Sequence, residues 1–162
     1  MYQEGDLIAN FIRPGVNAQG AITDISFKDL LQTAPLLILY VYPKDDTPGC
    51  TGEACDFRDA QPQWAPQAAL AGLSPDPPAS HQAFYANQKL NFPLLSDESL
   101  TLIKQLGAYG EKKLYGRVMQ GVIRSTFLIN AEGRMIKAFR GVKAKGHAAR
   151  MMQELAAMAH RG

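Results

Sequence analysis

The sequence predicts an α/β fold in which helices flank a central mixed β-sheet. The first observation is the segment Leu36 to Tyr42, a nearly unbroken apolar run that suits a strand buried on both faces of a sheet. The second is that strand-like segments alternate with segments that carry helix start and stop signals. The third is a predicted hairpin near the C-terminus, followed by a last helix. This order is typical of an α/β sandwich.

The first predicted helix begins at Ser26. The segment Ser26 to Asp29 resembles a capping box, in which a hydroxyl and an acid three residues later satisfy free N–H groups of the first turn. We expect the helix to run toward Thr33 and to end at Pro35, because proline cannot continue a helix. The apolar strand Leu36 to Tyr42 follows directly.

A loop and a second helix follow that strand. Pro43 to Gly49 is rich in turn-forming residues, and a helix is predicted from about Cys50 to Asp59. Thr47 suits the N-cap of this helix and Pro48 suits its first turn. The loop therefore places Cys50 close to the start of the helix.

Prolines punctuate the middle of the chain. We expect Pro62 and Pro66 to break the structure after the second helix, and Ser74 to Pro78 to form a turn. Ala68 to Leu73 lies between them and lacks the β-branched residues that favour a strand. Beyond the turn the pattern predicts five more elements and one more turn: helices over Pro78–Leu90 and Ser99–Leu106, strands over Val122–Ile129 and Met135–Val142 joined by a turn at Asn130–Gly133, and a final helix over His147–Met158.

Length and composition indicate one globular domain over residues 1–162. Hydrophobic residues make up 46% and charged residues 20%, and the net charge is only +2 with scattered basic residues, so we expect no nucleic-acid partner. Leu36 to Tyr42, the longest apolar run, is too short to span a bilayer. The N-terminal segment carries acids where a signal peptide would be basic, so we expect a cytoplasmic protein with no membrane partner.

The chain has two cysteines, Cys50 and Cys55, too few for a disulfide scaffold. Cysteines this close together in a reducing compartment are more often catalytic, redox-sensing or metal-binding. The three histidines, His81, His147 and His160, share no ligand spacing, so we expect neither a metal site nor a cofactor. A redox role for the cysteines is therefore favoured.

Cys50 lies where an α/β protein places its reactive groups. It follows a central strand and lies in the first turn of the next helix, at the carboxyl edge of the predicted sheet. Unpaired N–H groups and the helix dipole at that position favour the thiolate, which is the nucleophilic form of cysteine. Thr47 can direct its hydroxyl at the sulfur or at a bound oxygen, and Gly49 allows a substrate to approach the backbone.

The spacing of Cys50 and Cys55 has a structural consequence. Five residues of helix rotate the side chains to directions roughly 140° apart, with Cα atoms roughly 8 to 9 Å apart. A disulfide needs a Cα separation of about 4.4 to 6.8 Å. Either the two thiols never bond, or the first turns of the helix unwind when they do.

The run from Tyr42 to Asp59 resembles the active-site signature of the peroxiredoxins, in the bacterioferritin comigratory protein or peroxiredoxin Q branch. Pro43, Thr47 and Cys50 match the family pattern of Pro, three residues, Thr, two residues and Cys. Cys55 matches the resolving cysteine of one subset of the branch. The likeness continues over nearly the whole chain, at residues 72–76, 92–97, 123–129 and 141–147.

The resemblance implies a thioredoxin-like fold and a thiol-dependent peroxidase. Cys50 would attack hydrogen peroxide or an organic hydroperoxide and become a sulfenic acid. Cys55 would then form an intramolecular disulfide with Cys50, which a thioredoxin-type reductant would reopen. The branch is often monomeric, so the resemblance also favours a monomer.

The same resemblance implies roles for four further residues. Arg124 would stabilise the thiolate and the charge that develops on the peroxide, because a guanidinium stays charged and offers donors in one plane. Thr47 would hydrogen-bond the substrate or the sulfur, and Pro43 would shield the pocket from water. Glu53 matches a position that holds the arginine in place.

Two other functions stay open on this pattern. A thiol–disulfide oxidoreductase of thioredoxin or glutaredoxin type is disfavoured because four residues, rather than two, separate Cys50 and Cys55. A peroxide sensor that keeps the fold without turnover is disfavoured by the intact set of Thr47, Cys50 and Arg124.

Overall fold

The apolar run that opened the sequence argument lies at the centre of the fold. The computed structural model describes the backbone of residues 1–161, and the side chains of all of these except residues 114 and 159–161. Within that part, one mixed sheet has the order β2-β1-β5-β4-β3-β8-β9. Its strands are β1 (Ile12–Val16), β2 (Ile22–Ser26), β3 (Leu36–Val41), β4 (Ala68–Ser74), β5 (Leu94–Ser96), β8 (Ser125–Asn130) and β9 (Met135–Arg140).

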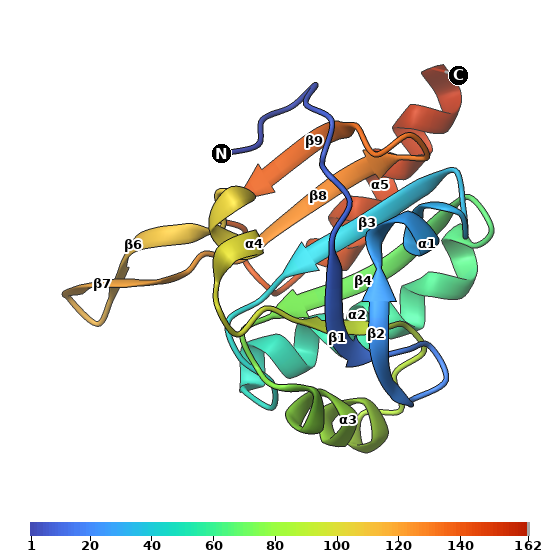
Figure 1. The fold of residues 1–162 in the computed structure, drawn as a ribbon. Coiled ribbons are helices and arrows are strands. Elements are labelled where there is room, and N and C mark those ends of the chain that lie inside the picture. Colours follow the sequence, from blue (N-terminus) through green and yellow to red (C-terminus); the bar gives the residue numbers. More distant parts are fainter. Residues whose placement is uncertain (162) are drawn as a thin grey trace.

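Helices cover both faces of this sheet (Figure 1). They are α1 (Phe27–Leu31), α2 (Pro48–Trp64), α3 (Pro78–Asn87), α4 (Thr101–Gln105) and α5 (His147–Arg161). Strand β3 shows how the two layers are filled, because its side chains alternate between them. Leu37, Leu39 and Val41 pack in the core on the α1 and α4 side, whereas Ile38 and Tyr40 pack against α2 and α5. Burial on both faces explains the continuous apolar run.

The arrangement around β3 confirms the predicted α/β fold of thioredoxin-like type. Strand β4 pairs with β3 in parallel, while β8 pairs with β3 and β9 with β8 in antiparallel fashion. Helix α2 connects β3 to β4, and α5 follows β9 and packs against α2. This unit places the N-terminus of α2 at the carboxyl edge of β3, where Cys50 lies.

Strand β4 forms despite its weak β-propensity, because its small residues fit between large neighbours. A Cβ added at Gly72 would lie 2.8 Å from the side chain of Leu94 and 3.1 Å from the ring of Tyr40. Packing within the sheet therefore selects Ala and Gly here, where intrinsic preference would not.

The prediction that the second helix ends near Asp59 and that Pro62 breaks the structure after it is wrong. Helix α2 runs from Pro48 through Pro62 to Trp64. A proline at this position cannot donate to the carbonyl of Arg58, four residues earlier. The side-chain amide of Asn91 donates to that carbonyl instead, at 3.2 Å, so the helix continues for two more residues.

A second difference concerns Arg124, which was expected inside a strand over Val122–Ile129. The structure divides that segment between β7 (Arg117–Val122) and β8, with Ile123 and Arg124 as a two-residue link. Strands β6 (Tyr109–Leu114) and β7 form a separate hairpin that projects from the body of the protein (Figure 1). The change of direction between the hairpin and β8 takes Arg124 out of both sheets.

The other predicted elements are present with shifted ends. Ser26 caps α1 by accepting a hydrogen bond from the backbone N–H of Asp29 at 3.3 Å, as the capping pattern predicts. The short strands β1, β2, β5, β6 and β7 were not predicted, since none carries a long apolar run. No helix in the described part of the chain is long and apolar enough to cross a bilayer.

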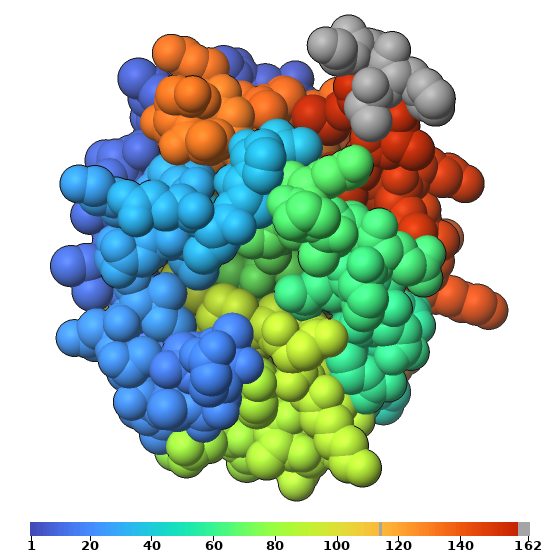
Figure 2. Space-filling model, turned by 90° about the vertical axis from the view of Figure 1, so that its right-hand side faces the viewer, coloured from blue at the N-terminus to red at the C-terminus, as the bar shows by residue number. Residues whose placement is uncertain are grey.

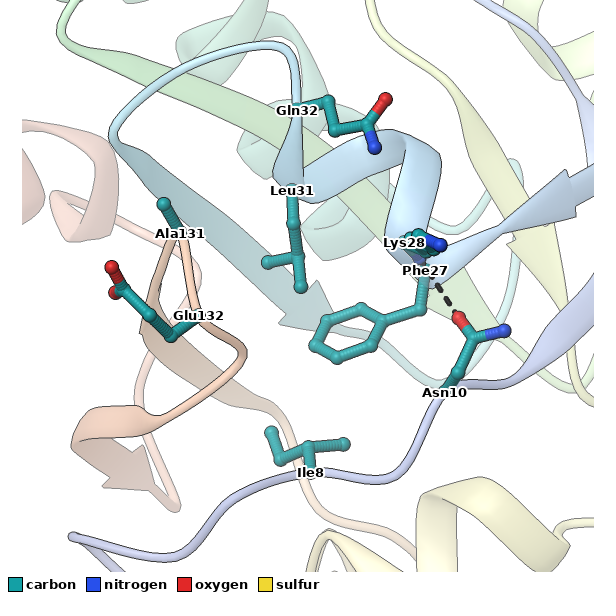
Figure 3. A pocket seen from close by; sticks show the side chains of 8 residues that line it. All are labelled: Ile8, Asn10, Phe27, Lys28, Leu31, Gln32, Ala131 and Glu132. Atoms are coloured by element: carbon teal, nitrogen blue, oxygen red, sulfur yellow. Dashed lines mark hydrogen bonds between the residues drawn. The ribbon is translucent and has the colours of Figure 1, made fainter.

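Two hollows in the surface lie away from the cysteines. The larger, of about 420 Å³, opens between residues 17–34, the end of α2 and residues 91–93 (Figure 2). The smaller, of about 300 Å³, is lined by Ile8, Phe27 and Leu31 among others, next to the hydrogen bond from the Lys28 backbone to Asn10 (Figure 3). Neither is lined by a residue of the predicted active site.

Candidate active site

Cys50 is the third residue of α2 and lies just beyond the carboxyl end of β3. Thr47 occupies the N-cap position and Pro48 begins the helix, as predicted. Cys50 is 2% exposed, so it lies in a site that is nearly closed to solvent. Free N–H groups of a first turn and the helix dipole favour a thiolate at this position.

Arg124 reaches Cys50 from the link between β7 and β8, 74 residues later in the chain. Its Nη2 donates to Cys50 Sγ at 3.2 Å, and its Nη1 donates to Glu53 Oε1 at 2.5 Å. Burial of the guanidinium opposes its charge, but Glu53 and Cys50 outweigh burial and raise the pKa of Arg124. A permanent positive charge therefore lies against the sulfur.

Glu53 lies one helical turn after Cys50 and is 1% exposed. Its Oε1 accepts from Arg124, whereas its Oε2 is buried and has no hydrogen-bond partner. Burial raises the pKa of Glu53 to about 7, although Arg124 pulls in the opposite direction. The carboxyl group therefore changes charge near neutral pH. The guanidinium of Arg124 connects it to the Cys50 sulfur.

Tyr40 supplies another buried polar group on this side of the sheet. Its hydroxyl has no hydrogen-bond partner, and its ring stacks on Tyr42 and tilts against Phe57. Burial, and then the negative charge of Glu53, raise the pKa of Tyr40 well above its usual value. The phenol therefore stays neutral beside the site.

Thr47 and Pro43 lie beside the site, and no hydrogen bond joins Thr47 to the sulfur in the described part of the chain. The Thr47 hydroxyl donates to the carbonyl of Lys44 at 3.0 Å, so its oxygen stays free to accept a further hydrogen bond. Pro43 is half-buried at the end of β3. The structure thus joins Cys50, Arg124 and Glu53 directly and places Thr47 and Pro43 in the loop beside them.

Cys55 lies in the second turn of the same helix and is partly buried. Its Sγ donates to Gln88 Oε1, at the end of α3, over 3.6 Å. Both cysteines are free and α2 is continuous through them, which agrees with the separation predicted from their spacing. A Cys50–Cys55 disulfide requires this part of α2 to unwind.

A second cluster of polar side chains, around Asp45, was not predicted from the sequence. Asp45, in the loop before α2, contacts Ser80 and His81 at the start of α3, and its backbone N–H donates to Asp76. The available signal was positional: Asp45 follows β3 and Asp76 follows β4, and the carboxyl ends of adjacent parallel strands meet at one edge.

The cluster could offer ligands to a metal ion, since one atom each of Asp45, Asp76 and His81 lie within 4.8 Å of one another. Hydrogen bonds within the protein already engage these atoms. His147 lies apart from the cluster and bonds Thr126 at 2.7 Å, while the His160 side chain is outside the described residues.

Comparisons with known proteins show the family to which the chain belongs. Residues 5–138 match the AhpC/TSA family. The peroxiredoxin Bcp of Bacillus subtilis is 44% identical over 126 residues, which are 77% of this chain and 80% of that protein. Its counterpart in Xanthomonas campestris is 42% identical over 124 residues, 76% of this chain and 78% of that protein.

Solved structures give the same result for the fold. A cysteine-to-serine mutant of PrxQ from Xylella fastidiosa superposes with a TM-score of 0.85 at 35% identity, over 98% of each chain. A mutant of peroxiredoxin Q from Xanthomonas campestris gives a TM-score of 0.78 at 36% identity, over 91% of this chain and 90% of that one. The chain belongs to the AhpC/TSA family and, within it, to the thiol peroxidases of the bacterioferritin comigratory protein or peroxiredoxin Q branch.

Proposed function

We propose that this protein reduces hydrogen peroxide and organic hydroperoxides with Cys50 as the attacking thiolate. The observation that carries the proposal is the contact of Arg124 with both Cys50 and Glu53 at the first turn of α2. The sulfur attacks one peroxide oxygen, an S–O bond forms and the O–O bond breaks. The leaving oxygen takes a proton from solvent, so the products are a sulfenic acid and water or an alcohol.

Arg124 and Thr47 have separate tasks in this step. Arg124 stabilises the thiolate before the attack and the negative charge on the leaving oxygen during it. The proton of Thr47 is committed to the carbonyl of Lys44, so the Thr47 oxygen accepts the O–H of the incoming peroxide. Pro43 keeps water from the sulfur, and Glu53 fixes the plane of the guanidinium.

Cys55 resolves the sulfenic acid in the second step of the proposal. The first turns of α2 unwind, the contact of Cys55 with Gln88 is lost, and the Cys55 sulfur displaces the sulfenic oxygen as water. A thioredoxin-type dithiol then reduces the disulfide with two electrons. We further propose that residues 1–162 act as one domain, as a cytoplasmic monomer without cofactor, on the sequence arguments above.

Two serine variants in the same helix test the cycle. With a thioredoxin, its reductase and NADPH, the wild type consumes peroxide continuously. Cys50→Ser abolishes consumption, whereas Cys55→Ser consumes one equivalent and then stalls, with one added oxygen on Cys50 by mass spectrometry. Each variant controls for the other, since both replace one sulfur of α2 by oxygen. Turnover of Cys50→Ser at the wild-type rate would refute the proposal.

A further inference from the structure

Asp45 is the buried residue of the loop that carries the site. From Pro43 to Gly49 the other side chains are exposed or half-buried, whereas Asp45 is 5% exposed. A buried carboxylate is costly unless hydrogen bonds replace its water. Tyr42 donates to Asp45 Oδ1 at 2.6 Å, and Ser80 donates to Asp45 Oδ2 at 2.8 Å.

His81 supplies the third partner and is 0% exposed. Its Nε2 lies 3.0 Å from the carbonyl oxygen of Leu95, which can only accept, so Nε2 carries a hydrogen. Its Nδ1 lies 2.8 Å from Asp45 Oδ2. Two unprotonated lone pairs would repel at that distance, so a proton lies between the imidazole and the carboxylate.

This pair connects three elements of the fold. Asp45 is in the loop between β3 and α2, His81 is in the first half of α3, and Leu95 is in β5. The backbone N–H of Asp45 adds a fourth hydrogen bond, to Asp76 at 2.7 Å. The loop is therefore attached through one residue to the two elements that follow β4.

The hydrogen-bonded position of Asp45 also fixes the neighbouring residues that are proposed to react. The carbonyl of Lys44, adjacent to Asp45, accepts the Thr47 hydroxyl, and Thr47 is the N-cap of α2. Cys50 comes three residues after Thr47. Because short, hydrogen-bonded segments join these residues, a shift of Asp45 displaces both the acceptor oxygen of Thr47 and the first turn of α2.

We propose that Asp45 and His81 are positioning residues that hold Thr47 and Cys50 in the geometry for peroxide attack. The proposal rests on the function proposed above. It accounts for two buried ionisable side chains that the chemistry of Cys50 does not use. A metal ion at the same place would have to displace hydrogen bonds from Tyr42 and Ser80, which already engage both oxygens of Asp45.

A matched pair of His81 variants tests the proposal. In His81→Asn the amide nitrogen replaces Nδ1 and keeps the bond to Asp45, whereas in His81→Gln it replaces Nε2 and keeps the bond to Leu95. Each variant loses one buried hydrogen bond, so both lower the urea midpoint of unfolding similarly. The second-order rate constant of Cys50 oxidation by hydrogen peroxide, from single-turnover mass spectrometry, falls about tenfold or more in His81→Gln and under about threefold in His81→Asn.

Equal rate constants in the two folded variants would overturn the proposal, because a purely structural histidine does not distinguish its two nitrogens. A wild-type protein that does not react with peroxide would instead refute the proposed function. Stoichiometric Zn²⁺ binding that Asp45→Asn abolishes would also overturn the proposal, in favour of a metal site.

Ser80→Ala gives a second test that does not depend on the folding of the His81 variants. It removes one O–H donor to Asp45 and leaves the imidazole in place. We expect the rate constant of Cys50 oxidation to fall about threefold, by the loss of one hydrogen bond, with no change in Ser99→Ala, at an exposed serine. The same rate constant in both serine variants would contradict the proposal.

Discussion

The two cysteines of α2 lie one and a half turns apart in very different surroundings. Cys50 is almost inaccessible and lies against Arg124, which Glu53 holds in turn. Cys55 is partly exposed, and its side chain makes a long contact with the amide of Gln88. The comparison shows that a fixed positive charge lies against the Cys50 sulfur, which is proposed to attack the peroxide. The Cys55 sulfur, which is proposed to move to Cys50, is held only by a long contact.

Removal of Arg124 should have the largest effect, because it takes the fixed charge away from Cys50 and leaves the surroundings of Cys55 unchanged. Arg124→Ala is expected to lower the rate constant of Cys50 oxidation by about 100- to 1000-fold, as for the loss of a preorganised charge partner. Stopped-flow measurement with hydrogen peroxide provides the test. Arg117→Ala, at an exposed arginine of the neighbouring hairpin, serves as the control and should react normally. A fall of less than threefold in Arg124→Ala would show that the charge beside Cys50 is not used.

Glu53, which lies beside Cys50, should make the free energy of unfolding of the protein depend on pH near neutrality. Its pKa is about 7 in the folded protein and near 4.5 when exposed, so the folded state binds more protons between these values. The stability from Glu53 is therefore complete below pH 4.5 and is lost as the pH rises through 7. From pH 5 to pH 8 the free energy of unfolding should fall by about 2 kcal/mol more in the wild type than in Glu53→Gln.

Urea unfolding at the two pH values measures this difference. His147, whose pKa burial lowers to about 4, gives an opposite slope between pH 4 and 6.5. It is present in both proteins, so its contribution cancels in the comparison. Parallel pH profiles for the wild type and Glu53→Gln would rule out a titration of Glu53 near neutrality.

The smallest effect is expected on the Cys55 side. Gln88→Ala removes the acceptor that holds the Cys55 thiol, so disulfide formation after one equivalent of peroxide should become about two- to threefold faster. Gln63→Ala, at an exposed glutamine of α2, is the control. Slower disulfide formation in Gln88→Ala would mean that Gln88 guides Cys55 rather than retaining it.

Local signals in the sequence were sufficient for part of this description. Ser26 and Asp29 lie within one turn, so the cap of α1 could be predicted. The apolar residues of β3 are consecutive, so the burial of this strand could be predicted too. The meeting of Cys50 with Arg124 was not, because 74 residues and a projecting hairpin separate them. Only the family resemblance indicated that contact.

Other features depend on partners that no local pattern identifies. The continuation of α2 through Pro62 requires the amide of Asn91, which comes from a distant loop. The pairing of Asp45 with His81 depends on β3 and β4 being adjacent and parallel. Each of these is a long-range contact between residues that are unremarkable in their own segments, which is why the sequence alone did not reveal them.

The contacts at Arg58 also limit how far α2 can melt. Its carbonyl is held by Asn91, its guanidinium donates to the carbonyl of Gln88 at 2.6 Å, and the adjacent Phe57 is fully buried. Unwinding that begins at Pro48 therefore meets an anchored residue after about three turns. Amide hydrogens before Arg58 should exchange with solvent in small, frequent openings, while those beyond it exchange only with the whole domain. We therefore expect α2 to unwind between Pro48 and Arg58 while the part that follows Arg58 stays folded.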